Sequence, residues 1–374
     1  MKHRHCNITT RSNYTVYVCC VVGILFFFSL SIFHEGEAAG RRRGATQRKS
    51  AHKRPAIQHV TIGTATKVQI PFNYRLSKPM KRVYRSHDFM VKVFSKRFAQ
   101  GNAAYMEIVS LNKEGFSSDF GITADLEGKQ ILLTRMLWGY RGIFAFPVDM
   151  RPGQKTITVK TTTPVEEITY TYPITVRWTR FPVYRGSMDL GKYSNRNYLK
   201  GKPELLKKIQ DNYKKRAEVF SRVSSDLLTA HLAHPRNYHK ITSAFNAKRI
   251  TRRYIIRGRR KISKKSSVHQ HSGVDLKGWD GTPVYALASG KVAVAEDMYY
   301  EGNHTMIDHG NGIITRYMHQ SKIIVTPGQF VKGGQLIGYC GKTGMVTGPH
   351  LHIGLYIRGE YVDPLSFLSL PIRE

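Results

Sequence analysis

Histidine residues are concentrated in the last third of the chain. Seven of the sixteen histidines lie between His269 and His352. An imidazole can bind a transition metal through a ring nitrogen, and it can accept or release a proton near neutral pH. A cluster of this kind therefore predicts a metal site or a proton-transfer site in this part of the chain.

The first motif in the cluster is His271-Ser272-Gly273-Val274-Asp275. It offers an imidazole nitrogen and a carboxylate oxygen four residues apart, and both are good zinc ligands. Gly273 between them allows the backbone to bend without a Cβ clash. This spacing alone occurs often by chance, so the motif gains weight only from the other histidines.

Two further motifs place histidines on strand-like runs. In Gly348-Pro349-His350-Leu351-His352, an alternating strand would turn both histidines to one face and Leu351 to the core behind it. One imidazole could then bind a metal while the other stands beside an open coordination position. His319 ends a second strand-like run that begins at Ile313. The chain has no HExxH motif, so a glutamate base of the thermolysin kind is not expected.

The net charge of the chain is strongly positive. Its 59 Lys and Arg residues against 25 Asp and Glu residues give a formal charge of +34. Such a charge favours an anionic partner, which could be nucleic acid, an anionic lipid surface or a carboxylate-rich cell wall. Nucleic acid is not expected, because the basic residues are spread over several segments instead of following one recognisable nucleic-acid-binding fold.

The four cysteines exclude a disulfide-stapled domain. Cys6, Cys19 and Cys20 lie in the N-terminal segment, which leaves Cys340 alone in the rest of the chain. A single cysteine cannot form an intramolecular disulfide, and no CxxC pair suggests a structural zinc site. Cys340 is expected to be a small buried residue.

The N-terminus has the order of an export signal. Basic residues precede an apolar run over 16–33, and small residues follow it, so residues 1–39 are predicted to be a signal peptide or an uncleaved signal anchor. The run of about 18 residues is just long enough to span a bilayer. Residues 40–56 form a basic linker. We expect an exported protein of the periplasm or cell envelope, with anchoring in the inner membrane as the alternative to cleavage.

Residues 57–185 alternate with period two, which predicts a small β-sandwich-like domain. Between Glu167 and Trp178, the large apolar residues share one parity. Residues 186–235 are predicted to be a connecting segment, since residues 203–230 repeat apolar positions every three or four residues as an amphipathic helix does. Residues 236–374 return to a strand-rich, glycine-punctuated pattern. The fold expected is mainly β.

Residues 240–368 resemble the LytM/lysostaphin family of zinc metallopeptidases, which hydrolyse peptidoglycan peptides. The resemblance rests on five motifs in order: HSGVD at 271–275, GTPVYALASGKV at 281–292, IDHGNGIITRYMH at 307–319, PGQFVKGGQLIG at 327–338 and TGMVTGPHLHIGL at 343–355. Several motifs in sequence are far more specific than any one of them. The β-domain and helix upstream are similar to the arrangement in multi-domain members from Gram-negative bacteria.

The resemblance implies an antiparallel β peptidase domain and a role for each site residue. His271, Asp275 and His352 would bind one zinc ion per chain, and His319 and His350 would flank a zinc-activated water and the substrate carbonyl. The implied function is endopeptidase cleavage of cross-links or stem peptides in bacterial peptidoglycan. The alternative is a catalytically silent module of the same fold that binds cell wall or activates an amidase. All five residues are present, which favours the enzyme.

The stretch from Arg249 to Lys265 contains nine Lys or Arg residues and leads directly into the site. It is interpreted as a loop. Either it recruits carboxylate-bearing stem peptides or an anionic envelope surface, or it is simply a solvated surface segment.

Overall fold

The computed structural model describes residues 57–62, 66–188, 193, 196–257, 259–263 and 266–374. The predicted export segment 1–39, its apolar run 16–33 and the predicted linker 40–56 lie outside these residues. Among the described residues, no helix is both long and apolar enough to cross a membrane.

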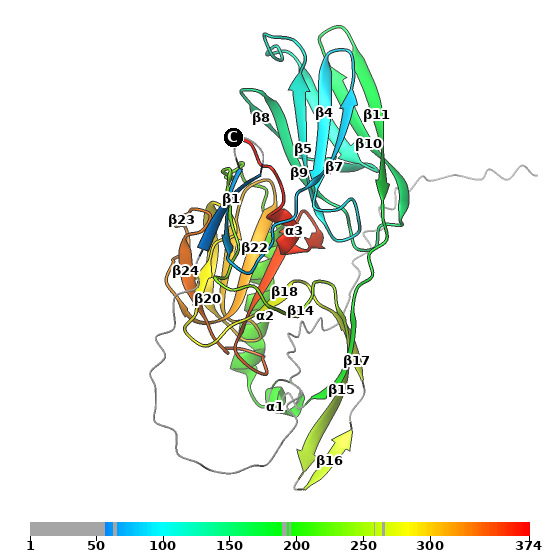
Figure 1. Ribbon diagram of the computed structural model, residues 1–374. Coiled ribbons are helices and arrows are strands. Elements are labelled where there is room, and N and C mark those ends of the chain that lie inside the picture. Colours follow the sequence, from blue (N-terminus) through cyan, green and yellow to red (C-terminus); the bar gives the residue numbers. More distant parts are fainter. Residues whose placement is uncertain (1–56, 63–65, 189–192, 194–195, 258, 264–265) are drawn as a thin grey trace, which may run out of the picture.

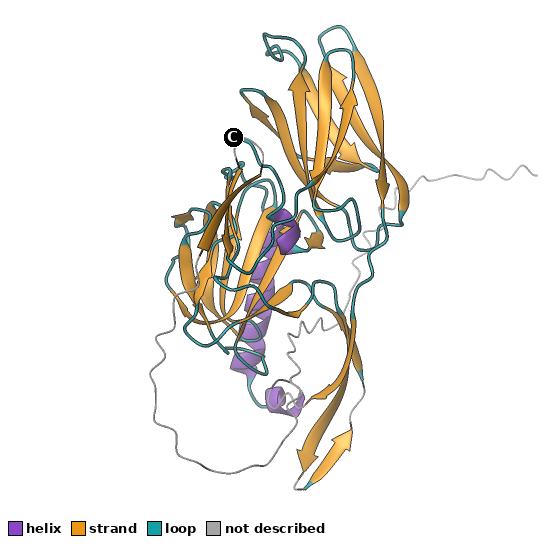
Figure 2. Ribbon diagram, viewed as in Figure 1, coloured by secondary structure: helices purple, strands orange, loops and turns teal. Residues whose placement is uncertain are grey.

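The chain folds into two bodies that are rich in strands, and a narrow arm extends from the larger one (Figures 1 and 2). The smaller body, here called the sandwich, consists of two antiparallel sheets. The five-stranded sheet has the order β3 (Met80–Arg85), β4 (Phe89–Ser95), β5 (Ala103–Ser110), β9 (Gly139–Ala145) and β8 (Leu133–Met136). The four-stranded sheet has the order β11 (Glu167–Val176), β10 (Gly153–Thr162), β6 (Gly121–Leu126) and β7 (Lys129–Ile131).

Alternation along the strands builds the core of the sandwich. In β11, Tyr172, Ile174 and Val176 are buried while the residues between them are exposed. They pack with residues of the other sheet, including Val91 and Met106. One face of each sheet is thus apolar, and stacking the two faces removes both from water.

The larger body, here called the main body, is built on a ten-stranded sheet of antiparallel pairs. Its central order is β14 (Ile241–Ser243), β18 (Val274–Lys277), β25 (His350–Ile357), β22 (Ile313–Ile323), β21 (Gly302–Asp308), β20 (Gly290–Met298) and β23 (Phe330–Val331). The sheet also contains β19 (Pro283–Tyr285), β24 (Leu336–Cys340) and β26 (Glu360–Val362), and the short helix α3 (Pro364–Phe367) follows it. Cys340 is buried as expected. The predicted mainly β fold is confirmed.

The first two described strands belong with the main body by their pairing. β1 (Ile57–Ile62) pairs with β2 (Thr66–Pro71), and β2 pairs in parallel with β13 (His231–Ala233). Thr66 also donates a hydrogen bond through Oγ1 to the carbonyl of Ile372 at 2.6 Å, across 306 positions of the chain. These strands therefore do not pair with the sandwich, although the domain predicted over 57–185 begins with them. The predicted domain boundaries stay a prediction.

The connecting segment contains two helices, α1 (Arg196–Lys200) and α2 (Pro203–Ser221). Pro203 begins α2 in the first turn as expected. The helix is shorter than the predicted range 203–230, because after Ser221 the chain becomes extended and pairs with other segments through its backbone. Consequently Val223 is 62% exposed instead of lying on a buried helical face. On the main body, Val219 of α2 packs with residues of β20 and β21.

The basic stretch 249–265 is not a loop, and this prediction is wrong. Its described residues form most of β15 (Lys248–Arg257) and β16 (Arg260–Ser263), which pair as a hairpin. β15 also pairs with β12 (Val183–Met188) and β17 (Ser267–Gln270). These four strands form the arm in Figure 1. The high charge of this segment suggested a solvated loop. Its backbone is instead hydrogen-bonded to neighbouring strands.

A buried arginine ties the two bodies together. Arg141 of β9 donates to Asp226 Oδ2 at 3.0 Å, to the carbonyl of Leu228 at 2.8 Å and to the carbonyl of Arg373 at 2.8 Å. Both charged side chains of this pair are nearly inaccessible to solvent. Tyr105 of the sandwich is part of the same apolar core as the strands of the main body, so the contact between the bodies is an extensive one.

Replacing Arg141 by Met should lower the free energy of unfolding by about 3 kcal/mol, because Asp226 would remain buried without its partner. Denaturant unfolding followed by circular dichroism measures the change. The matched control is Lys160→Met, which removes one partner of the exposed pair with Glu167. The control should change stability by no more than about 0.5 kcal/mol. Equal effects of the two changes would contradict the role given to Arg141.

Candidate metal centre and active site

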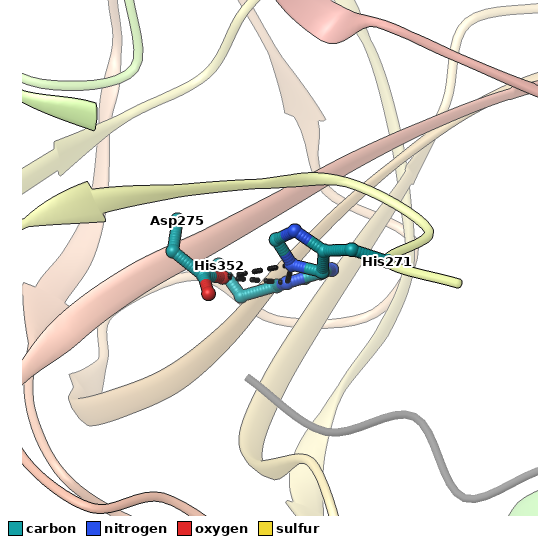
Figure 3. A group of neighbouring side chains, drawn as sticks. All are labelled: His271, Asp275 and His352. Carbon is teal, nitrogen blue, oxygen red and sulfur yellow. Dashed lines mark hydrogen bonds and ion pairs between the residues drawn. The ribbon is translucent and has the colours of Figure 1, made fainter. Parts of the chain in front are cut away.

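Three of the predicted site residues come together in the main body. Among the described residues, His271, Asp275 and His352 form the group whose ligand atoms could hold a metal ion. His271 Nε2 lies 2.9 Å from His352 Nδ1 and 3.0 Å from Asp275 Oδ1. His352 Nδ1 lies 2.9 Å from the same oxygen. Figure 3 shows the three side chains meeting at this point.

The register of two strands sets this geometry. β18 pairs with β25 so that Asp275 lies directly opposite His352. His271 reaches the same point because the chain turns between β17 and β18. Gly273 is needed in that turn, since a Cβ atom there would lie 2.2 Å from the carbonyl oxygen of Ile353 and 2.7 Å from His352 Nε2. The glycine therefore permits a close approach of the turn to the His352 ring.

Hydrogen bonds and burial fix the protonation states of the three groups. His271 Nδ1 lies 2.8 Å from the carbonyl of Ala244 and donates to it, which leaves a lone pair on Nε2. Burial lowers the pKa of His271, and it lowers the pKa of His352 to about 3. Burial acts to raise the pKa of Asp275, but His271, His350 and Arg249 outweigh it and hold that pKa well below its ordinary value. Both imidazoles are neutral and the carboxylate is ionised at neutral pH.

This donor set fits a tetrahedral metal ion such as zinc. Two neutral imidazole nitrogens and one carboxylate oxygen converge with separations of 2.9–3.0 Å, and a single proton on His352 Nδ1 cannot serve all three contacts. Zinc bound by nitrogen and oxygen at about 2.0–2.2 Å would accept a lone pair from each group. Three protein ligands leave one position open, as in catalytic zinc sites and unlike closed structural ones.

The other two predicted residues stand beside this group. His350, on the same strand as His352, has Nε2 3.8 Å from Asp275 Oδ1. The ring of His319 lies 5.0 Å from that of His350 and 6.3 Å from that of His352, measured between centroids. Leu351 is buried on the opposite side of the strand, as the alternation predicts. The sequence motifs thus name five residues that the fold brings together.

Backbone carbonyls orient both flanking histidines. His350 Nδ1 lies 2.9 Å from the carbonyl of Gly348, and His319 Nδ1 lies 3.0 Å from the carbonyl of Thr343. Donation by each Nδ1–H leaves the lone pair on Nε2. Burial lowers the pKa of His319 well below its ordinary value, and His350 and His352 add to the shift. The ring of His319 is therefore neutral at pH 7.

His319 is held in an unusual backbone conformation. Its φ angle is +64°, in the left-handed region that residues with a side chain rarely adopt. Its backbone N–H donates to the carbonyl of Glu301 at 2.9 Å. The Glu301 carboxylate in turn pairs with Arg216 of α2 in a buried contact. His319 lies within β22, at an irregularity in its pairing with β21, and the connecting helix supports this irregularity through Glu301. No sequence motif predicts this link.

Arg249 also contacts the group and is not among the residues that the motifs predict. Its guanidinium donates to Asp275 Oδ2 at 2.8 Å from β15. A strand prediction for residues 248–252 would have indicated that Arg249 is buried. Along that strand Arg249 and Thr251 are buried, whereas Lys248 and Arg252 are exposed.

A cavity of about 560 Å³ adjoins the group where the arm meets the main body. Its lining includes His271 and Ser272 of the first motif, Lys248 and Gln270 of the arm, and Glu360 of β26. The cavity combines apolar walls with a few amide, hydroxyl and charged groups, which is the usual lining of a ligand-binding pocket.

Known proteins share the part of the chain that contains this site. Residues 269–364 match peptidase family M23. Peptidoglycan DD-endopeptidase ShyB of Vibrio cholerae is 41% identical over 137 residues, 37% of this chain and 29% of that protein. Peptidoglycan DD-endopeptidase ShyA of Vibrio cholerae is 48% identical over 99 residues, 26% of this chain and 23% of that protein.

Among solved structures, the catalytic domain of lysostaphin from Staphylococcus simulans is 40% identical, covers 27% of this chain and 80% of that chain, and has a TM-score of 0.26. The chain spans less than a third of the length of either Vibrio relative. The resemblance inferred from the five motifs is confirmed by the family match. Residues 269–364 of the chain therefore match peptidase family M23, and His271, Asp275, His319, His350 and His352 all lie within that match.

Proposed function

We propose that this protein is a zinc-dependent endopeptidase that hydrolyses peptide bonds of bacterial peptidoglycan. The observation that supports it most directly is the convergence of His271, Asp275 and His352 on one point, with His319 and His350 beside it. The family match and the two Vibrio relatives, which are named peptidoglycan DD-endopeptidases, agree with this chemistry. By the same comparison, we propose that the bond cut is a D,D cross-link between stem peptides.

The residues of the site would have different roles in the proposed hydrolysis. A bound zinc ion would lower the pKa of a water molecule to about 7 and polarise the scissile carbonyl. The lone pair on Nε2 of His319 or His350 can accept a proton from the attacking water, and the same imidazole, once protonated, can return that proton to the leaving amine. The other imidazole can donate a hydrogen bond from Nε2 to the developing oxyanion when that ring has taken up a proton from bulk water.

The location follows from the substrate. Peptidoglycan lies outside the cytoplasm, so we propose that the protein is exported to the periplasm or envelope through residues 1–39. Cleavage of this segment would release the enzyme, and retention of the apolar run 16–33 would anchor it to the inner membrane.

The arm supplies a second contact with the cell wall in this proposal. Arg257 is paired with Arg260 and Ile256 with Lys261 in the hairpin of β15 and β16, so the sequence at this end of the arm is rich in basic residues. The carboxylates of stem peptides are the anionic partner that such a tip would attract.

Metal content and cleavage together test the proposed function. The purified protein should contain about one zinc ion per chain and release new peptide ends from peptidoglycan. His271→Ala should lose the zinc and reduce the cleavage rate by about 10³-fold or more, because three ligand atoms become two. Elemental analysis and mass spectrometry of the fragments measure both. A protein without zinc or cleavage would support the alternative, a silent module that binds the wall or activates an amidase.

The flanking histidines should separate metal binding from catalysis. His319→Ala and His350→Ala should each keep close to the normal zinc content, because neither side chain is one of the three converging ligands. Each should lower kcat by roughly 10²–10⁴-fold through the loss of proton transfer or oxyanion stabilisation. Loss of zinc in either variant, or kcat unchanged in both, would contradict these roles.

Neutralising the tip of the arm tests its contact with the wall. Replacing Arg257, Arg259, Arg260 and Lys261 together by Ser should weaken sedimentation of the protein with peptidoglycan, more at low salt than at high salt, and leave zinc content unchanged. The control removes four exposed lysines elsewhere by substituting Lys113, Lys160, Lys207 and Lys214 with Ser. Equal weakening by both sets would show a general charge effect and reject a specific role for the arm.

A further inference from the structure

We propose that Arg249 is a positioning residue that restricts Asp275 to binding the metal through one oxygen. This inference rests on the proposed zinc peptidase function. Arg249 Nη2 donates to Asp275 Oδ2 at 2.8 Å, and the Arg249 residue is only 2% exposed. The Asp275 side chain is fully buried.

The two oxygens of the carboxylate have separate partners. Oδ1 faces His271 Nε2 at 3.0 Å and His352 Nδ1 at 2.9 Å, so it is the oxygen directed at the metal position. Oδ2 is engaged by Arg249. A carboxylate free at both oxygens can bind a metal through both, whereas one oxygen held by a guanidinium leaves a single ligand atom. The fourth coordination position then remains for water.

Arg249 also joins the outer contacts of two ligands. Its Nη2 donates to Ser243 Oγ at 2.6 Å, and that hydroxyl lies 3.4 Å from His271 Nδ1. Ala244, the next residue, accepts the hydrogen bond from His271 Nδ1. The segment 243–249 thus holds the outer edge of both His271 and Asp275. Such outer contacts fix the orientation of metal ligands.

The strand around Arg249 explains why the side chain points inward. β15 lies between β12 and β17, with Arg249 paired to Tyr184 on one side and to His269 on the other. Arg252, on the same strand, is exposed. Arg249 therefore points to the side of the strand that faces Asp275, whereas the side chain of Arg252 is exposed to solvent.

The burial of Arg249 is not expected to stabilise the fold, because only part of its guanidinium is hydrogen-bonded. Among the described residues, its Nε and Nη1 atoms have no hydrogen-bond partner although they are buried. Burying a charged group with unpaired donors is costly. Its hydrogen bonds go to Asp275, which is one of the three converging ligands, and to Ser243, which lies beside His271. A role in holding the ligand accounts for a guanidinium kept in this position.

The test compares the zinc affinity of the full-length protein with that of three variants. Arg249→Met should weaken zinc binding about 10–100-fold, the usual effect of losing an outer contact to a metal ligand. Arg249→Lys keeps the charge but loses the planar fork, so its affinity should lie between those of Arg249→Met and the wild type. Arg252→Met removes an exposed charge from the same strand and should bind zinc like the wild type. Competition with a chromophoric chelator measures each affinity.

The visible absorption spectrum of cobalt-loaded protein reports the coordination number of the metal, which a loss of protein stability alone would not change. In cobalt-loaded protein, Arg249→Met should reduce the intensity of the visible absorption bands, because a second carboxylate oxygen raises the coordination number above four. The spectrum of Arg252→Met should match that of the wild type.

Wild-type zinc affinity together with an unchanged cobalt spectrum in Arg249→Met would overturn the proposal. Circular dichroism of the chelator-treated proteins shows whether each variant folds. If Arg249→Met does not fold, Arg249→Lys decides, and wild-type affinity in that variant rejects the role. Wild-type protein that binds zinc but leaves peptidoglycan intact would reject the proposed substrate without affecting this test. Wild-type protein that binds no zinc would reject both.

Discussion

The carboxylate of Asp275 lies where water cannot reach it, and a charge in that position must be matched by its neighbours. Two imidazoles face one of its oxygens and a guanidinium holds the other. Each of these neighbours comes from a different segment: the turn before β18, the strand β25 and the inner face of β15. The central sheet, the glycine turn and the base of the arm can all be understood as the means of surrounding one buried negative charge.

The same requirement explains why the site extends beyond the region shared with the family. The matched residues 269–364 contain the five converging side chains. Arg249 precedes that region. Arg216, which pairs with Glu301 beside His319, precedes it by a larger distance. The matched region therefore supplies the five converging side chains, while the connecting helix and the arm supply contacts that orient them.

The sequence predicted those features that depend on local pattern. Alternation placed His350 and His352 on one face with Leu351 behind them, and the period of the strands predicted the sandwich. The length of α2 was overestimated because Val223 and Leu227 keep the helical spacing although the backbone there bonds elsewhere. The pairing of β2 with β13 joins segments far apart in the chain, and no local pattern indicates it. Arg249 was hidden because a run of basic residues resembles a solvated loop when its strand pairing is unknown.

The contact between Thr66 and Ile372 has a consequence for how the protein reaches its folded state. Strands near one end of the described chain complete a sheet of the main body, and the bond that secures them needs a residue 306 positions later. Topologies dominated by such distant pairs have high contact order and fold slowly, because closing a long loop costs entropy before the stabilising contact forms. During synthesis the sandwich can form first from its local hairpins, while the main body must wait for nearly the whole chain. The five side chains of the site would then come together late in folding, after most of the chain has been made.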